Sequence, residues 1–82
     1  MPSSDEIKQR IEASIPGAQA EVEDYTGGGD HFEAVVVSES FEGKTLVERH
    51  QAVYHALGDA MRARVHALTL KTLTPAQHAN RR

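Results

Sequence analysis

The sequence predicts one α+β domain whose elements follow the order helix, strand, strand, helix, strand, helix. Three observations predict this class. Two segments begin with a capping-box pattern and continue with apolar residues at helical spacing. Three other segments are alternating or rich in β-branched residues, and a proline-started segment closes the chain. A chain of 82 residues is too short for two hydrophobic cores, so we expect a single domain over residues 1–82.

The first helix is expected at the start of the chain. Ser3 and Glu6 stand three positions apart, which is the spacing of a capping box. Isoleucines then recur every fourth residue and form one apolar stripe that faces a core. The stripe consists of Ile7, Ile11 and Ile15. Pro16-Gly17 ends the helix.

A hairpin with a glycine-rich tip is expected next. Residues 18–25 alternate weakly between apolar and polar, and residues 32–37 are rich in β-branched side chains, which favours strands. Gly27-Gly28-Gly29-Asp30 lies between the two segments. A phosphate cradle needs a helix after its glycines, whereas a strand follows here, so the pattern favours a hairpin loop.

A long helix, a third strand and a short helix complete the chain. Thr45 with Glu48 repeats the capping box, and a stripe at helical spacing predicts a helix of about four turns. The stripe consists of Leu46, His50, Val53, Tyr54, Leu57 and Met61. Residues 65–73 return to strand character, and Thr74-Pro75-Ala76-Gln77 is typical of a helix start.

The order of these elements predicts how the sheet is connected. The first two strands form an antiparallel hairpin, and the helical crossover makes the third strand parallel to the second if these two are neighbours. We therefore expect a three-stranded mixed sheet with helices packed on one face. The other face is expected to carry Ala, Thr, Lys and Glu side chains and to be largely solvated.

The composition excludes several kinds of site. The chain has no cysteine, so it offers no disulfide, no thiolate zinc site and no thiol nucleophile. Neither Gly-x-Ser-x-Gly nor His-Glu-x-x-His occurs, and we expect no enzyme activity. The chain has no signal-peptide pattern and no apolar run of membrane-spanning length, so a cytoplasmic protein without a membrane partner is expected.

Histidines are the candidate metal ligands. His31 opens the second predicted strand and His66 opens the third, so both stand at the rim of the sheet, where an imidazole is ordered yet reachable. A structural histidine is the commoner role for either residue alone. His50 is expected to make a hydrogen bond at the edge of the core, and His78 is expected on the surface near the chain end.

Several motifs together resemble the BolA family. They are His31-Phe32-Glu33-Ala34-Val35-Val36-Val37-Ser38, Phe41-Glu42-Gly43, Arg49-His50-Gln51-Ala52-Val53-Tyr54 and Val65-His66-Ala67-Leu68-Thr69-Leu70. The most specific features are the spacing from Phe-x-Gly to Arg-His-x-x-Val-Tyr and the Val-His-Ala-Leu strand followed by Thr-Pro. The resemblance covers nearly the whole chain, and it implies a class II KH-like fold, in agreement with the order of elements above.

The resemblance also implies a partner and a cofactor. BolA-like proteins pair with monothiol glutaredoxins and share a bridging [2Fe-2S] cluster, for which the glutaredoxin cysteine and glutathione supply thiolates and the BolA-like chain supplies His66. Many relatives have a second ligand in the hairpin loop, where this chain has Gly27, Gly28 and Gly29. The second ligand is left open, and His31 is its nearest substitute. We expect the free protein to be a monomer without a cluster.

Nucleic-acid binding is the alternative function, because KH-like folds bind single strands and some BolA-like proteins are described as transcription regulators. The residues for a basic face are Lys44, Arg49, Arg62, Arg64 and Lys71. The net charge is −3, with ten acidic and two basic residues in 1–43 against two acidic and seven basic residues in 44–82. The chain lacks the Gly-x-x-Gly loop of a KH module, and its aromatic content is 5%, so DNA or RNA is the less favoured partner.

Overall fold

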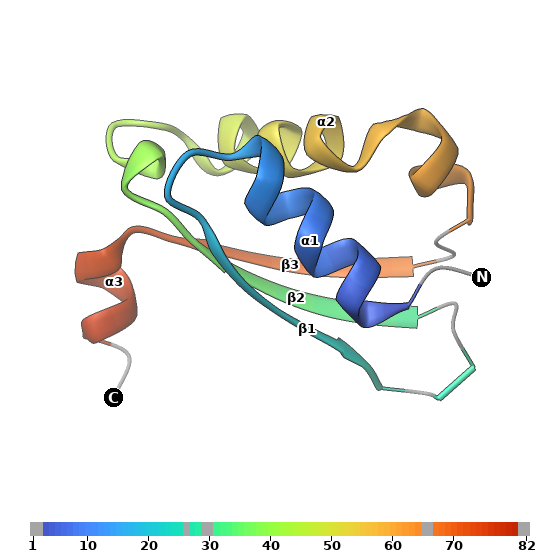
Figure 1. Ribbon diagram of the computed structural model, residues 1–82. Helices are drawn as coiled ribbons and strands as arrows, with labels where there is room; N and C mark the ends of the chain where they lie inside the picture. The colour runs from blue at the N-terminus through green and yellow to red at the C-terminus, as the bar shows by residue number, and fades with distance from the viewer. Residues whose placement is uncertain (1–2, 26, 29–30, 65–66, 81–82) are drawn as a thin grey trace.

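The computed structural model describes residues 3–25, 27–28, 31–64 and 67–80, with the backbone alone for 59–64 and 67. The helices are α1 (Ser4–Ser14), α2 (Leu46–Arg64) and α3 (Pro75–Ala79), and the strands are β1 (Gln19–Asp24), β2 (His31–Val37) and β3 (Ala67–Leu73). A single 3-10 turn spans Glu39–Phe41. The predicted α+β class and order of elements are confirmed (Figure 1).

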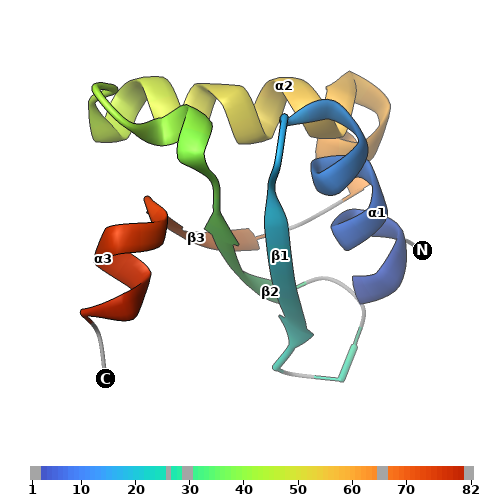
Figure 2. The same cartoon turned by 60° about the vertical axis from the view of Figure 1, so that its left-hand side comes forward.

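The sheet has the order β1-β2-β3 and the predicted mixed pairing. β1 runs antiparallel to β2, and β2 runs parallel to β3. Figures 1 and 2 show α1 and α2 together on one face of this sheet. The short helix α3 lies beyond one end of the sheet and buries none of its residues, so the helical layer consists of α1 and α2.

The inner face of the sheet carries the core. Along β2 the side chains alternate, so that Phe32, Ala34 and Val36 are fully buried under the helices, whereas Val35 and Val37 on the other face are partly exposed. The outer face therefore carries two valines beside the residue types expected there, because the register of β2 turns its odd-numbered residues outward.

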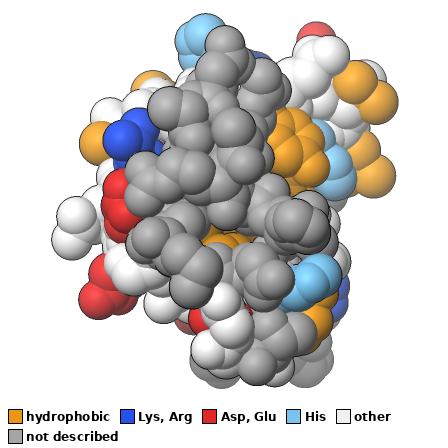
Figure 3. Space-filling view, turned by 90° about the vertical axis from the view of Figure 1, so that its right-hand side faces the viewer, with side chains coloured by type: hydrophobic (Ala, Val, Ile, Leu, Met, Phe, Trp, Pro, Cys, Tyr) orange, Lys and Arg blue, Asp and Glu red, His pale blue; other side chains and the backbone are white. Residues whose placement is uncertain are grey.

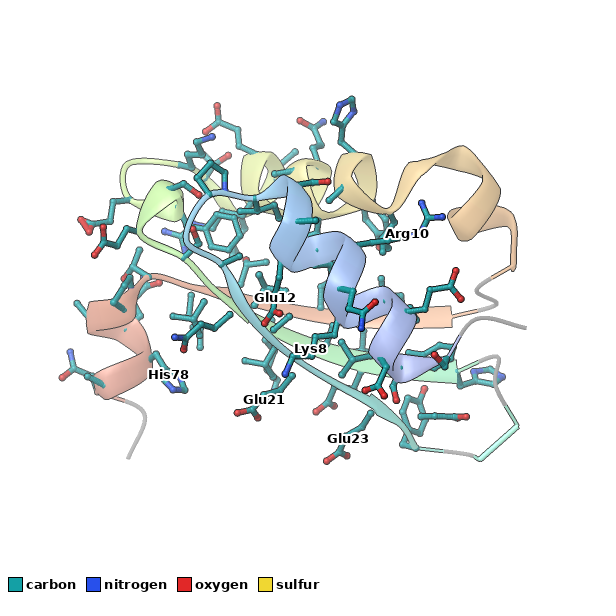
Figure 4. The ribbon with its side chains drawn as sticks, viewed as in Figure 1. Lys8, Arg10, Glu12, Glu21, Glu23 and His78 are labelled. Atoms are coloured by element: carbon teal, nitrogen blue, oxygen red, sulfur yellow. The ribbon has the colours of Figure 1, made fainter. Side chains whose placement is uncertain are left out.

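Helix α1 is anchored to both of its neighbours. The Ser3 hydroxyl accepts a hydrogen bond from the Glu6 backbone N–H (3.1 Å), and Ile7 and Ile11 are fully buried. Figure 4 shows Glu12 directed at β1, where its carboxylate accepts from the Ala20 N–H (3.0 Å). On the other side of α1, the Arg10 guanidinium donates to the Leu57 carbonyl of α2 (3.4 Å). These contacts connect α1 with β1 and α2.

Helix α2 begins with the predicted capping box. The Thr45 N–H donates to Glu48 Oε1 (2.9 Å), and the Glu48 N–H donates to Thr45 Oγ1 (3.2 Å). The hydrogen bonds from Thr45 lower the pKa of the Glu48 carboxyl below its ordinary value of 4.5. The box therefore favours the ionised carboxylate at the positive end of the helix.

The buried stripe of α2 differs from the expected one at its first turn. Val53 and Leu57 are buried as expected, but Leu46 is 62% exposed, and Arg49 is only 8% exposed. Arg49 lies four residues before Val53, so one face of the helix carries Arg49, Val53 and Leu57. The helix is also interrupted at Gly58, whose φ of 77° and ψ of 163° are not helical. No helix in the described part of the chain is long and apolar enough to cross a membrane.

Candidate functional site

The first candidate site is the end of the sheet where β2 and β3 begin. β2 starts at His31 and β3 starts at Ala67, and these two residues are partners in the parallel register. His31 is partly buried, and its ring lies 6.2 Å from the Tyr25 ring, centroid to centroid, with 58° between the planes. Figure 3 looks onto this end, where histidine, hydrophobic and charged side chains surround the atoms drawn in grey.

His66, the main ligand predicted from the resemblance, lies outside the described residues. Its neighbour in the sequence, Ala67, is placed and pairs with His31. The parallel register therefore brings the strand that follows His66 next to the strand that His31 opens. The sequence predicts that His31 opens the second strand and that His66 opens the third. The parallel pairing of β2 with β3 adds that the starts of these two strands are neighbours.

The loop between β1 and β2 contains the glycines at which the chain departs from the expected ligand pattern. Gly27 has a φ of 75°, and its N–H donates to Asp24 Oδ1 (3.0 Å). Positive φ is favourable for glycine and strained for most other residues. Neither Gly27 nor Gly28 has a side chain to offer a metal, and Gly29 lies outside the described residues.

The other histidines do not gather into a site. His50 is partly buried beside Leu46 and Leu70, and the structure shows no side-chain hydrogen bond for it within the described residues, so the bond expected there is not seen. His55 on α2 and His78 on α3 are exposed, as predicted for His78 (Figure 4). Among the residues that are described, no three His, Asp or Glu side chains are placed to hold a metal ion.

One of the five residues predicted for a basic face, Arg49, is not on the surface. Arg49 was expected on the surface, but it is buried because its guanidinium satisfies polar groups of three segments. Lys44 and Lys71 are exposed, as a binding face requires, whereas the side chains of Arg62 and Arg64 are outside the described part. The described structure therefore does not bring the five residues together as one basic surface.

Arg49 instead connects α2, β3 and α3. Its Nε donates to the Lys44 carbonyl (3.1 Å), and its Nη1 donates both to the Thr72 carbonyl (3.2 Å) and to Gln77 Oε1 (2.9 Å). The guanidinium carbon lies 5.9 Å from the centre of the Phe41 ring. Spacing could have found this buried residue, because Arg49 is four positions from Val53 and eight from Leu57.

The comparisons with known proteins identify the family. A family model described as "BolA-like protein" matches residues 5–77. The chain belongs to the BolA family. It is 46% identical over 76 residues to Protein BOLA2 of Arabidopsis thaliana, a match covering 85% of this chain and 81% of the relative. The chain spans only 23% of another relative from Arabidopsis thaliana, SufE-like protein 1, to which it is 31% identical over 86 residues.

Solved BolA structures share the fold. A bolA homologue from Coxiella burnetii superposes with a TM-score of 0.81 at 44% identity, covering 96% of this chain and 99% of that one. Yeast Fra2 superposes with a TM-score of 0.75 at 31% identity, covering 95% of this chain and 85% of that one. The expected BolA-like α+β fold is thereby confirmed.

The BolA motif residues of this chain have structural roles. Phe41 is 1% exposed, Val53 is fully buried, and Arg49 makes the three hydrogen bonds described above. The parts of the motif that made the family recognisable in the sequence therefore hold α2 against β3 and the 3-10 turn.

Proposed function

We propose that this BolA-like chain is a partner of a monothiol glutaredoxin and shares a bridging [2Fe-2S] cluster with it, in cluster trafficking or iron regulation. Membership of the BolA family supports the proposal, because this partnership is what the family resemblance implies. The observation that carries it for this chain is the pairing of His31 with Ala67, the residue after His66, at one end of the sheet.

The donor set of the chain suits a shared cluster better than one of its own. A [2Fe-2S] cluster needs four ligands, which are thiolates or, in part, imidazoles. This chain has no cysteine, and His31 pairs at one end of the sheet with Ala67, the residue that follows His66 in the sequence, so it has at most imidazoles to offer there. The thiolates would come from the glutaredoxin cysteine and glutathione, and the isolated protein would carry no cluster.

Each histidine has its own part in the proposal. His66 is the main ligand, and His31 is the candidate for the second, since the glycines of the loop leave no side chain nearby for that role. The β2–β3 register and the Tyr25 ring position His31 at the rim. Imidazole ligation raises the reduction potential of a cluster above that of all-thiolate ligation. No catalytic turnover by the chain itself is proposed.

The test is a titration of this protein into a cluster-loaded monothiol glutaredoxin with glutathione, followed by visible absorption and circular dichroism. The wild type is expected to change the cluster spectrum. His66→Ala is expected to abolish that change, His31→Ala to reduce it, and His55→Ala, on the exposed side of α2, to leave it unaltered. Far-ultraviolet circular dichroism checks that each variant is folded.

Two results would contradict the proposal at different levels. A wild-type protein that leaves the cluster spectrum and its own elution with glutaredoxin unchanged would refute the partnership. An unchanged spectral response with His66→Ala would refute the ligand assignment and would leave the partnership to contacts elsewhere on the surface.

A further inference from the structure

A surface hollow lies away from the histidine end, at the junction of α2, β3 and α3. Its volume is about 550 Å³, and its lining includes Lys44, Leu46, Arg49, Thr72, Leu73 and Gln77. We call it the Arg49 hollow. It is at the opposite end of β3 from Ala67, so it is separate from the candidate cluster site.

The charge of Arg49 is not balanced by the groups around it. All three of its hydrogen-bond acceptors are neutral, namely two backbone carbonyls and the Gln77 side-chain amide. The structure shows no ion pair between its guanidinium and a carboxylate of the described residues. A buried cation without a counter-ion is costly, so an anion in the hollow would be stabilised.

The Arg49 guanidinium has one nitrogen that is not used in these hydrogen bonds. The three hydrogen bonds occupy Nε and Nη1, and Nη2 makes none to the residues that are described. Among the described residues, Thr72 Oγ1 is the only fully buried side-chain N or O atom that has no hydrogen-bond partner. Nη2 has no such partner either, so it is not fully buried. Nη2 is therefore at least partly exposed, and Arg49 is one of the residues that line the hollow.

The remaining walls combine a second cation with apolar surface. Lys44 is exposed and lines the hollow, whereas Glu48 is not among the lining residues. Leu46 is 62% exposed although it is a large aliphatic residue, and Leu73 is partly exposed. An exposed leucine beside two cations suits a ligand with a charged end and an apolar body.

We propose that the Arg49 hollow binds a carboxylate attached to an aliphatic or aromatic body. The carboxylate accepts hydrogen bonds from Arg49 Nη2 and from the Lys44 ammonium, and the apolar body lies on Leu46 and Leu73. Because Nε and Nη1 already donate to other groups, the guanidinium offers the carboxylate only its Nη2 N–H groups, and the charge-assisted hydrogen bond there is not bidentate across two nitrogens. Free phosphate would leave the two leucines uncovered, so it is the weaker ligand.

The experiment titrates the whole, ¹⁵N-labelled protein with hexanoate, acetate or inorganic phosphate at constant ionic strength. The Arg49 Nε–H and the amides of Thr72, Leu73 and Gln77 are followed by NMR. Hexanoate is expected to shift these signals and to bind at least about threefold more tightly than acetate, because burying even two methylenes contributes more than this factor. Phosphate is expected to bind more weakly than hexanoate.

Variants locate the two halves of the ligand. Lys44→Gln is expected to lower the affinity for both hexanoate and acetate by about threefold, which is the contribution of an exposed ion pair. Leu46→Ala is expected to weaken hexanoate and to leave acetate unchanged. Lys8→Gln, an exposed lysine on α1 remote from the hollow, is the matched control and should change neither affinity (Figure 4). Arg49 itself is kept, because its hydrogen bonds support the fold.

Four outcomes would overturn the proposal. Equal affinity for hexanoate and acetate would show that the apolar body of the ligand makes no contribution to binding. Phosphate binding as tight as hexanoate binding would show that the hollow is a general anion site. Shifts that survive Lys44→Gln unchanged, or that Lys8→Gln reduces equally, would place the ligand elsewhere. None of these outcomes bears on the glutaredoxin proposal, which rests on the other end of β3.

Discussion

Arg49 is a charged residue of a type usually found on the surface, but it is buried in this structure. Its guanidinium carbon lies 5.9 Å from the centre of the Phe41 ring, and the guanidinium donates to carbonyl groups of the loop before α2 and of β3. A buried arginine is stable only where such acceptors are already arranged. Charge alone predicted a nucleic-acid contact for Arg49, whereas hydrogen bonding makes it a connector of three elements.

Arg49→Ala is expected to lower the free energy of unfolding by about 2 to 4 kcal/mol, because it removes three hydrogen bonds from a charged donor, one of them a buried bond to the Thr72 carbonyl. Urea denaturation followed by circular dichroism measures this loss. Lys71→Ala, at an exposed position of β3, is the control and should change stability by no more than about 0.5 kcal/mol. Equal effects of the two substitutions would show that Arg49 has no structural role.

At the scale of the element, α2 contains two local features that act in opposite directions. The capping box at Thr45 and Glu48 stabilises its start, and Gly58 interrupts it with a backbone conformation that residues with a side chain rarely adopt. A Cβ at Gly58 would meet no atom within 4 Å. Any effect of substituting Gly58 therefore reports on the backbone and not on packing.

Gly58→Ala tests the interruption of α2. Helix propensity alone predicts that alanine stabilises a continuous helix by about 1 kcal/mol. The φ of 77° and ψ of 163° instead predict a loss of about 1 to 3 kcal/mol, because this region is nearly restricted to glycine. Urea denaturation decides between the two signs. A chemically synthesised protein with D-alanine at this position is the control, since positive φ is favourable for a D-residue.

Glu48→Gln tests the capping box through its pH dependence. Because the folded-state pKa of Glu48 lies below 4.5, its contribution to stability is present above that pH and is lost as the pH falls through the folded pKa. The wild type is therefore expected to have a higher midpoint of thermal unfolding than Glu48→Gln at neutral pH, and the two midpoints should converge in acid. A difference that stays constant down to about pH 2, which is about two units below the usual pKa range of carboxyl groups, would exclude this role of the ionised carboxylate.

At the scale of the whole molecule, the uneven charge of the sequence becomes a spatial pattern. Glu21 and Glu23 on β1 share the outer face of the sheet with Glu33 on β2, and Glu23 stands directly opposite Glu33. Lys71 on β3 is an exposed cation on the same face. An outer face with three carboxylates on two of its strands repels phosphate groups, so the open side of the sheet does not suit a nucleic acid.

We therefore expect only weak binding to single-stranded oligonucleotides, measured by fluorescence anisotropy at several salt concentrations. A genuine interface would give a log-log salt slope of about −0.7 for each phosphate contact. A salt-dependent affinity in the micromolar range or tighter, lost when Arg62→Ala and Arg64→Ala are combined, would restore the nucleic-acid function. Lys8→Ala on α1 serves as the control for a general loss of positive charge.

Local sequence patterns were sufficient to predict most of the secondary structure of this BolA-like chain. The capping boxes at Ser3 and Thr45, the isoleucines of α1 and the β-branched run of β2 predicted the elements and their order. They succeeded because caps and periodic apolar residues act over three or four positions and need no distant partner. The same patterns placed His31 and His66 at the starts of strands.

Long-range packing sets which of these local features come into contact. It put His31 beside Ala67, exposed Leu46, buried Arg49 under β3 and α3, and moved α3 off the sheet. These outcomes depend on contacts between residues 23 to 36 positions apart in the sequence, such as Arg49 with Thr72 and His31 with Ala67. The free energy of such contacts belongs to the packed arrangement, and no short segment of the sequence contains both partners.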